Sequence, residues 1–166
     1  LRHAMESMSQ SSSFSDLLKS YNLRPLFISI LVMMGQQTSG INAVLSYSQN
    51  IFALTSSGMS PLMETIIMDL MMVVATLLAA GVSDRLGRRF LIIISGSTIF
   101  LSLLSIGTYY FLDSGGYPIV KSLSWLPLVS LCFHVMSFSF GYGPIPWLLM
   151  SEIFAPEIRG YASAIA

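Results

Sequence analysis

The apolar residues of this chain fall into four long blocks that are separated by short polar segments. The blocks cover residues 26–52, 62–82, 90–112 and 125–150. A helix that crosses the hydrocarbon core of a bilayer needs about 20 consecutive, mostly apolar residues. Each block meets that length, whereas buried helices of a large soluble protein would be shorter, with charges between them. We therefore predict an all-α bundle of four transmembrane helices.

The composition supports this class. Hydrophobic residues make up 54% and charged residues 10% of the 166 residues, and the mean hydropathy is +0.72. Soluble domains carry about 25% charged residues. The net charge is zero and no basic patch is present, so we expect no nucleic-acid partner.

The sequence contains no motif that is typical of a catalytic site, a metal site or a disulfide. Cys132 is a lone cysteine inside the fourth block, so the chain cannot form an internal disulfide. Nothing resembles a nucleophile with its base, a phosphate-binding loop or a metal cluster. We expect a protein that is not an enzyme and that uses no metal and no cofactor.

The positions of the basic residues predict the orientation in the membrane. Basic residues lie before the first block, between the second and third blocks, and after the fourth block. They are Lys19, Arg24, Arg85, Arg88, Arg89 and Arg159. The two opposite loops contain only one basic residue, Lys121. Loops rich in Lys and Arg face the cytoplasm. We expect an integral protein of the plasma membrane with both ends of the chain cytoplasmic and with outer turns near residues 55–61 and 113–124.

Residues 1–23 form a polar lead-in to the first block. The segment is rich in Ser and lacks the features of a secretory signal. Residues 14–19 fit either the start of an amphipathic helix at the membrane or a disordered linker. Arg24 and Pro25 are expected to open the first span, because Pro is tolerated in the first turn of a helix. Four spans leave large surfaces with nothing to pack against, so we expect the chain to be a fragment.

The first block is interrupted by polar residues at membrane depth. Within residues 35–42 it contains the amides Gln36, Gln37 and Asn42. Amides also hold transmembrane bundles together, but three in so short a stretch exceed that need, since each costs energy when unpaired in hydrocarbon. On a straight helix they lie near 0°, about 100° and about 240°. A loosening around Ser39 and Gly40 would let them converge on a solute-binding cavity.

The fourth block is interrupted by Gly141, Gly143, Pro144 and Pro146. These residues break helices, and irregular backbone at membrane depth persists where it is buried in protein or lines a cavity. Broken helices near the midplane are typical of transporter binding sites. Trp147 follows directly. Its flat ring suits stacking on a sugar ring in the cavity, and the alternative is an anchor at the membrane interface.

The link between the second and third blocks is a charged turn. It contains Asp84, Arg85, Gly87, Arg88 and Arg89. Glu152 and Arg159 follow the fourth block and are predicted to lie at the same membrane face. Pairs among these charges would hold helix ends together in one of two states; the alternative is an ordinary basic cytoplasmic loop.

These segments together resemble the sugar porters of the major facilitator superfamily. The matching stretches are residues 36–43, 84–89 and 141–147, with residues 152–154 and 159–160. They occur in the order and spacing of that family, and the resemblance covers the chain from about Phe14 onward. The overall sequence most resembles the insect facilitated trehalose and glucose transporters. The resemblance implies a partial major facilitator fold, spans seven to ten of twelve, in a carrier that works by alternating access.

The resemblance also implies roles for individual residues. Sugar hydroxyls would be bound by Gln36, Gln37 and Asn42, with Phe138 and Trp147 lining the cavity. Tyr47 would belong to the outer gate, and the broken segment with Gly141, Gly143, Pro144 and Pro146 would flex. The cytoplasmic charge network would comprise Asp84, Arg85, Arg88, Arg89, Glu152 and Arg159, with Gly87 in its turn.

Two positions depart from the family pattern. Ser46 stands where the family usually has a Tyr, and Met72 stands where it commonly has an amide. Asp69 and His134 are ionisable groups within predicted spans, and such groups are often functional. For His134 we favour a buried position with local partners. Asp69 is a candidate for proton coupling.

The function predicted from these features is facilitated diffusion of a sugar, a hexose or trehalose, across a membrane. The alternatives are a proton-coupled sugar symporter and a non-transporting sugar sensor with the carrier fold. The expected partners are the sugar, the lipid bilayer, and the N-terminal half and last two spans of the same carrier. Within the chain, residues 1–23 would end an intracellular segment and residues 24–166 would form part of the C-terminal half.

Overall fold

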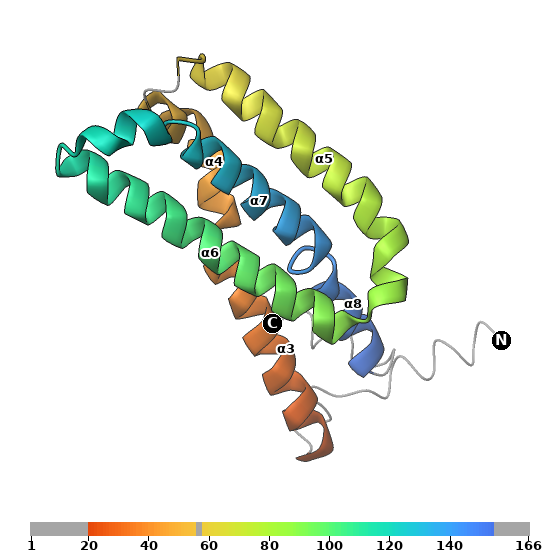
Figure 1. Ribbon diagram of the computed structural model, residues 1–166. Coiled ribbons are helices and arrows are strands. Elements are labelled where there is room, and N and C mark those ends of the chain that lie inside the picture. The colour runs from red at the N-terminus through yellow and green to blue at the C-terminus, as the bar shows by residue number, and fades with distance from the viewer. Residues whose placement is uncertain (1–19, 56–57, 155–166) are drawn as a thin grey trace. The chain divides into compact units, whose positions relative to one another are not determined.

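The computed structural model describes residues 20–55 and 58–154 (Figure 1). The side chains of residues 20–22, 80 and 82–86 lie outside this description. Residues 14–19, for which the sequence left a helix and a linker as alternatives, also lie outside it. The described residues form helices and no strands, which confirms the all-α prediction for them. In chain order the helices are α3 (Ser20–Thr38), α4 (Ile41–Ala53), α5 (Pro61–Leu86), α6 (Arg88–Ser114), the 3-10 helix η1 (Pro118–Leu123), α7 (Leu126–Phe140) and α8 (Ile145–Ile153).

Three segments of the described chain are long and apolar enough to cross a membrane: Pro61–Ala79, Arg88–Ser114 and Leu126–Ile153. They correspond to the second, third and fourth predicted spans. The first block is not one continuous helix, which agrees with the predicted loosening around Ser39 and Gly40. It consists of α3 and α4, which meet at residues 39–40.

The break between α3 and α4 follows from Gly40. Its φ is +75°, in the left-handed region that costs other residues energy. The Gly40 N–H donates to Gln37 O at 3.3 Å, and the Val44 N–H donates to Gly40 O at 3.0 Å, so the bonding of α4 restarts at this glycine. The start of α3 differs from the expectation: the helix begins at Ser20, so Pro25 lies inside it and not in its first turn.

The chain divides into two compact units, Leu1–Gln36 with Pro144–Ala166, and Gln37–Gly143. In the first unit, Leu26 of α3 and Phe154 after α8 are buried, and Ile30 and Ile153 pack against them. The Ser29 hydroxyl donates to Pro25 O at 2.9 Å. This bond stays within α3.

The second unit is organised around α7, which lies between α5 and α6 (Figure 1). One apolar cluster joins α4, α5 and α7 through Ile41, Val44, Phe52, Met68, Leu131 and Val135. α5 starts cleanly because Ser60 caps it: the Met63 N–H donates to Ser60 Oγ at 3.4 Å, and Pro61 occupies the first turn. Gly87, with φ +78°, separates α5 from α6.

Small polar side chains tie α7 to its neighbours. The Ser95 hydroxyl of α6 donates to Ser137 O of α7 at 2.6 Å. On the other side, Thr76 Oγ1 of α5 lies 3.2 Å from Ser139 Oγ of α7. The Thr76 hydroxyl donates to Met72 O at 2.8 Å, so the Ser139 hydroxyl supplies the donor between the two helices. Hydroxyl residues at such helix contacts let apolar helices pack closely in a membrane.

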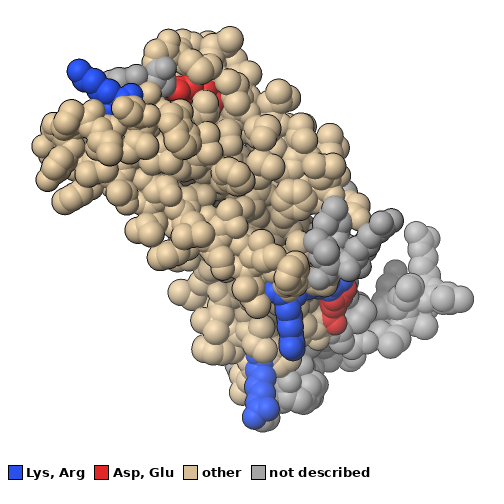
Figure 2. Space-filling model, viewed as in Figure 1, with Lys and Arg blue, Asp and Glu red and all other residues tan. Residues whose placement is uncertain are grey.

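The outer faces of α5 and α6 are mostly apolar. Leu77 is 72% and Ile93 is 67% exposed in the described structure. The charged residues of α6 lie at its ends, Arg88 and Arg89 at the start and Asp113 near the finish. The surface between charged ends is uncharged in the view of Figure 2. Such faces suit contact with lipid or with further apolar helices.

Candidate functional site

The amides of the first interruption meet at the α3–α4 break. Asn42 Nδ2 donates to Gln37 Oε1 at 3.1 Å, although the two residues would lie about 140° apart on a continuous helix. The left-handed Gly40 between them allows this contact. The structure thus shows the expected convergence for these two side chains.

The bond between the two amides leaves complementary groups available. Gln37 and Asn42 are both exposed. Gln37 Nε2 can still donate, and Asn42 Oδ1 can still accept, since no described residue bonds to either group. A donor and an acceptor side by side match neighbouring hydroxyl groups, because each hydroxyl both donates and accepts.

Phe138 lies in the same unit as this amide pair. It is half-buried on α7 and packs against the cluster that contains Ile41 and Val44 of α4. Met72 of α5 packs against the same cluster as an apolar contact. Tyr47 is 58% exposed on α4. The second unit therefore places an aromatic ring against the apolar cluster to which α4, α5 and α7 contribute.

The second interruption forms a turn between α7 and α8. The Gly141 N–H donates to Ser137 O at 3.1 Å, and the Gly143 N–H donates to Phe138 O at 2.8 Å. Gly141 also lies against α6: a Cβ at this position would come within 2.9 Å of Leu91 O and 2.6 Å of Ser95 Oγ. Pro144 and Pro146 follow at the start of α8.

Gln36 and Trp147 belong to the first unit. Gln36 is half-buried near the end of α3, and Trp147 is 60% exposed on α8. Their contribution to a sugar site stays a prediction.

The charged turn is described only in part. Gly87 makes the turn, Arg88 is half-buried and Arg89 is exposed at the start of α6. Glu152 is exposed near the end of α8. The side chains of Asp84 and Arg85, and all of Arg159, lie outside the described part of the chain, so the charge network stays a prediction.

The two ionisable groups within the spans differ in their surroundings. Asp69 is exposed on α5 and, with Met72, Val73, Thr76 and Leu77, lines an open hollow of about 320 Å³. His134 is fully buried on α7, as expected, but neither ring nitrogen has a hydrogen-bond partner among the described residues. The expectation of local partners for His134 is therefore wrong: its ring is surrounded by the packed interior of the second unit.

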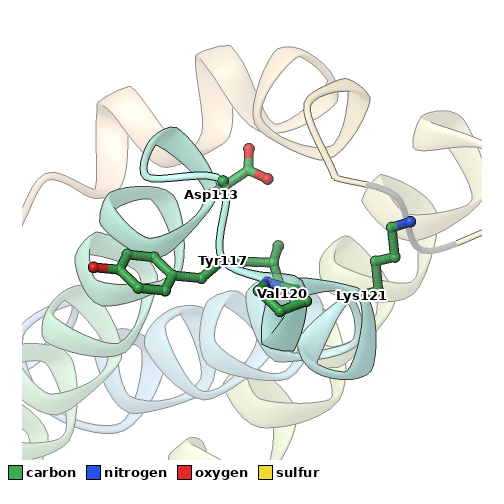
Figure 3. A pocket seen from close by; sticks show the side chains of 6 residues that line it. Asp113, Tyr117, Val120 and Lys121 are labelled. Carbon is green, nitrogen blue, oxygen red and sulfur yellow. The ribbon is translucent and has the colours of Figure 1, made fainter.

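A second hollow of about 320 Å³ lies at the turn between α6 and α7. Asp113, Tyr117 and Lys121 are among its lining residues, and their polar ends point in different directions (Figure 3). Groups that bind one small solute converge on it. This hollow is therefore a weaker candidate for a solute site than the amide pair.

The sequence did not predict the structural roles of three residues. Ser95 bonds across to α7, Tyr110 of α6 donates to Ile51 O of α4 at 2.6 Å, and Glu64 is buried in the first turn of α5. For the burial of Glu64 the sequence held no signal, because an acid near a helix start is an ordinary pattern. For Ser95 and Tyr110 the sequence offered none, since hydroxyl residues are common in such spans.

Known proteins with similar sequences and structures are carriers. A profile of the family described as "Sugar (and other) transporter" matches residues 1–166. A facilitated trehalose transporter of Anopheles gambiae is 41% identical over 165 residues, which are 99% of this chain and 20% of that protein. One from Polypedilum vanderplanki is 42% identical over 165 residues and is covered to 32%.

Among solved structures, the crystal structure of a D-xylose-proton symporter matches with a TM-score of 0.66 and 28% sequence identity. The match covers 99% of this chain and 35% of the symporter. The chain thus spans about a fifth to a third of the length of these proteins.

Proposed function

Because the chain belongs to the family of sugar and other transporters, we propose that it is part of a membrane carrier that moves a sugar, a hexose or trehalose, by facilitated diffusion. The carrier would alternate between two states that open to opposite sides of the membrane. The similar proteins are named as facilitated trehalose transporters and as a D-xylose-proton symporter, and all of them are transporters.

The hydrogen-bonded pair of Gln37 and Asn42 carries this proposal. Gln37 Nε2 would donate to one sugar hydroxyl, and Asn42 Oδ1 would accept from the next. Two adjacent hydroxyls on a ring are the feature that distinguishes a sugar from an apolar solute. Because the two amides already hold each other at 3.1 Å, little side-chain freedom is lost when the sugar binds.

Other predicted residues would complete the cavity. Phe138, which packs against the apolar cluster of α4, α5 and α7, would contact the apolar face of the sugar ring. Gln36 would add a third amide, and Trp147 would stack on the ring from α8. Tyr47, exposed on α4, would cover the cavity from the outer side.

The proposed arrangement in the membrane follows the basic loops. Arg88 and Arg89 would face the cytoplasm, together with both ends of the chain, in the plasma membrane. Residues 1–23 would end an intracellular segment, and residues 24–166 would form part of the C-terminal half. The N-terminal half and the last two spans would supply the opposing wall of the cavity, since the chain covers 20–35% of similar proteins.

The cytoplasmic charges would stabilise one of the two states. Asp84, Arg85, Arg88, Arg89, Glu152 and Arg159 would pair across helix ends when the inner side is closed and separate when it opens. Gly141, Gly143, Pro144 and Pro146 would let the α7–α8 segment change its backbone between the states.

Uptake of labelled trehalose and glucose by the whole carrier in vesicles tests the proposal. Gln37→Ala and Asn42→Ala should each raise the half-saturating sugar concentration by about 5- to 50-fold, since each loses a hydrogen bond in a desolvated site. Asn50→Ala is a matched control, because Asn50 is an exposed amide about 12 Å further along α4. Equal effects of the three variants would remove the amide pair from the site.

A proton-coupled symporter is the second candidate, and Asp69 favours it. This carboxyl is exposed on a helix that is long and apolar enough to span the membrane, where ionisable groups often serve proton relays. A protonophore that abolishes concentrative uptake would establish this alternative against facilitated diffusion. Sugar binding without any uptake would instead favour a sensor.

A further inference from the structure

The turn between α6 and α7 encloses a hollow of about 320 Å³ whose walls are held in place. It is lined by Asp113, Gly116, Tyr117, Pro118, Val120 and Lys121. Two backbone bonds fix the start of the turn: the Gly116 N–H donates to Asp113 O at 2.9 Å, and the Tyr117 N–H donates to Leu112 O at 3.2 Å. Val120 of η1 is buried, so packing fixes this wall of the hollow.

Two opposite charges line this hollow without neutralising each other. Asp113 lies in the last turn of α6 and Lys121 lies on η1, and both side chains are exposed. No described residue forms an ion pair with either side chain. In Figure 3 the carboxylate and the ammonium lie apart and point in different directions. A ligand that reached both groups would need a cationic end and an anionic end.

The hollow lies at the edge of the apolar part of the second unit. It sits at the turn between two segments that are long and apolar enough to cross a membrane, Arg88–Ser114 and Leu126–Ile153. Tyr117 and Trp125, both in the link between these segments, have exposed rings. Tyr and Trp are enriched at the headgroup layer of a bilayer. The two charges of the hollow are therefore expected at the depth of the lipid headgroups.

Exposed apolar side chains accompany the two charges. Phe111, two residues before Asp113, is 74% exposed, and Ile119, two residues before Lys121, is 55% exposed. A ligand with a charged head and apolar tails would find both kinds of surface at this turn. A free polar solute would leave the apolar surface uncovered, which favours a lipid as the occupant.

We propose that the turn between α6 and α7 binds the headgroup of a zwitterionic phospholipid, phosphatidylethanolamine. Lys121 Nζ donates to the lipid phosphate, and the Asp113 carboxylate accepts from the lipid ammonium. Both bonds are charge-assisted, and they have opposite polarity. An anionic lipid such as phosphatidylglycerol would bind Lys121 but would offer no cation to Asp113. The site does not depend on which solute the carrier moves.

Native mass spectrometry of the whole carrier, delipidated in detergent, tests this selectivity. The carrier is titrated with phosphatidylethanolamine and, separately, with phosphatidylglycerol, and the wild type should bind the former more tightly. Lys121→Gln should weaken phosphatidylethanolamine binding about two- to fivefold, as for an exposed charge pair. Asp113→Asn should weaken it by a similar factor and strengthen phosphatidylglycerol binding, because the carboxylate that repels an anionic lipid is gone.

Two further variants serve as controls. Ser122→Ala should leave both affinities unchanged, because Ser122 is the exposed, uncharged neighbour of Lys121 on η1. Lys121→Arg should keep the preference of the wild type, since a guanidinium also binds phosphate. A wild type that prefers phosphatidylglycerol would overturn the proposal. So would an unchanged ratio of the two affinities in both Asp113→Asn and Lys121→Gln.

A photoactivatable phosphatidylethanolamine locates the site, and it should label residues 111–121. Labelling of the carrier that spares these residues would overturn the proposal. Free phosphoethanolamine distinguishes a lipid from a soluble zwitterion: it should not displace the bound lipid at equal concentration, and displacement would overturn the lipid as the ligand. None of these readouts involves sugar, so they fail or succeed independently of the uptake assay that judges the proposed function.

Discussion

Replacing Gly141 with Ala should destabilise the carrier through the contact between α6 and α7. The φ of Gly141 is −122°, so the new side chain meets no left-handed strain, and the available space decides the outcome. The Cβ would come within 2.6 Å of Ser95 Oγ and 2.9 Å of Leu91 O. Ser95 is 2% exposed and has little room to move.

Two costs add in this variant. Forcing a methyl group into a packed helix contact costs about 1–3 kcal/mol. Displacing Ser95 also weakens its 2.6 Å bond to Ser137 O, which costs about 0.5–1.5 kcal/mol. The sum is about 1.5–4.5 kcal/mol, which should lower the apparent Tm measurably.

Thermal unfolding of the purified whole carrier, followed by tryptophan fluorescence, measures this effect. Gly107→Ala is the matched control on α6, because a Cβ there meets no atom within 4 Å and alanine favours a helix. Ser95→Gly combined with Gly141→Ala should recover part of the loss, since it removes the nearest side chain. If Gly141→Ala unfolds at the same temperature as Gly107→Ala, the close approach of the two helices is not present in the carrier.

Three further substitutions probe other features of the fold. Gly96→Ala should cost less than about 1 kcal/mol, because its Cβ meets only the movable end of Tyr142, at 3.1 Å; a Tm loss as large as that of Gly141→Ala would contradict this. Gly40→Ala should lower stability by about 1–2 kcal/mol, because φ is +75° there while the surrounding space is open, and an unchanged Tm would show that the break takes another form. His134→Met should leave the Tm unchanged or raise it, because the buried imidazole has no hydrogen-bond partner among the described residues; a loss above roughly 2 kcal/mol would reveal a partner elsewhere in the carrier.

The sequence predicted the helical class and the places where helices break, since both depend on local properties. The long apolar blocks correspond to α5, α6 and the α7–α8 segment. The polar stretch around Gly40 marked the break after α3, because glycine alone adopts its torsion at no cost. The bond between Gln37 and Asn42 was foreseeable once that break was assumed.

What could not be predicted depends on contacts between helices. Nothing in the chain distinguishes Ser95, which ties α6 to α7, from Ser97, which donates to Ile93 O within its own helix. Glu64 in the first turn of α5 has the pattern of an ordinary acidic residue near a helix start, and only the packing shows that it is buried. The missing partner of His134 is likewise a property of the assembled unit.

The prolines at the start of α8 have a consequence for water. Pro144 and Pro146 have no N–H, so neither can donate to the carbonyls four residues earlier, at Phe140 and Tyr142. Where no other backbone donor reaches these carbonyls, they can bind water or a hydroxylated solute at hydrocarbon depth. Water bound there would raise the local dielectric constant, so that the proposed sugar substrate could exchange its water shell gradually. The barrier to passage of the sugar would then depend on the two missing backbone N–H groups as much as on any side chain.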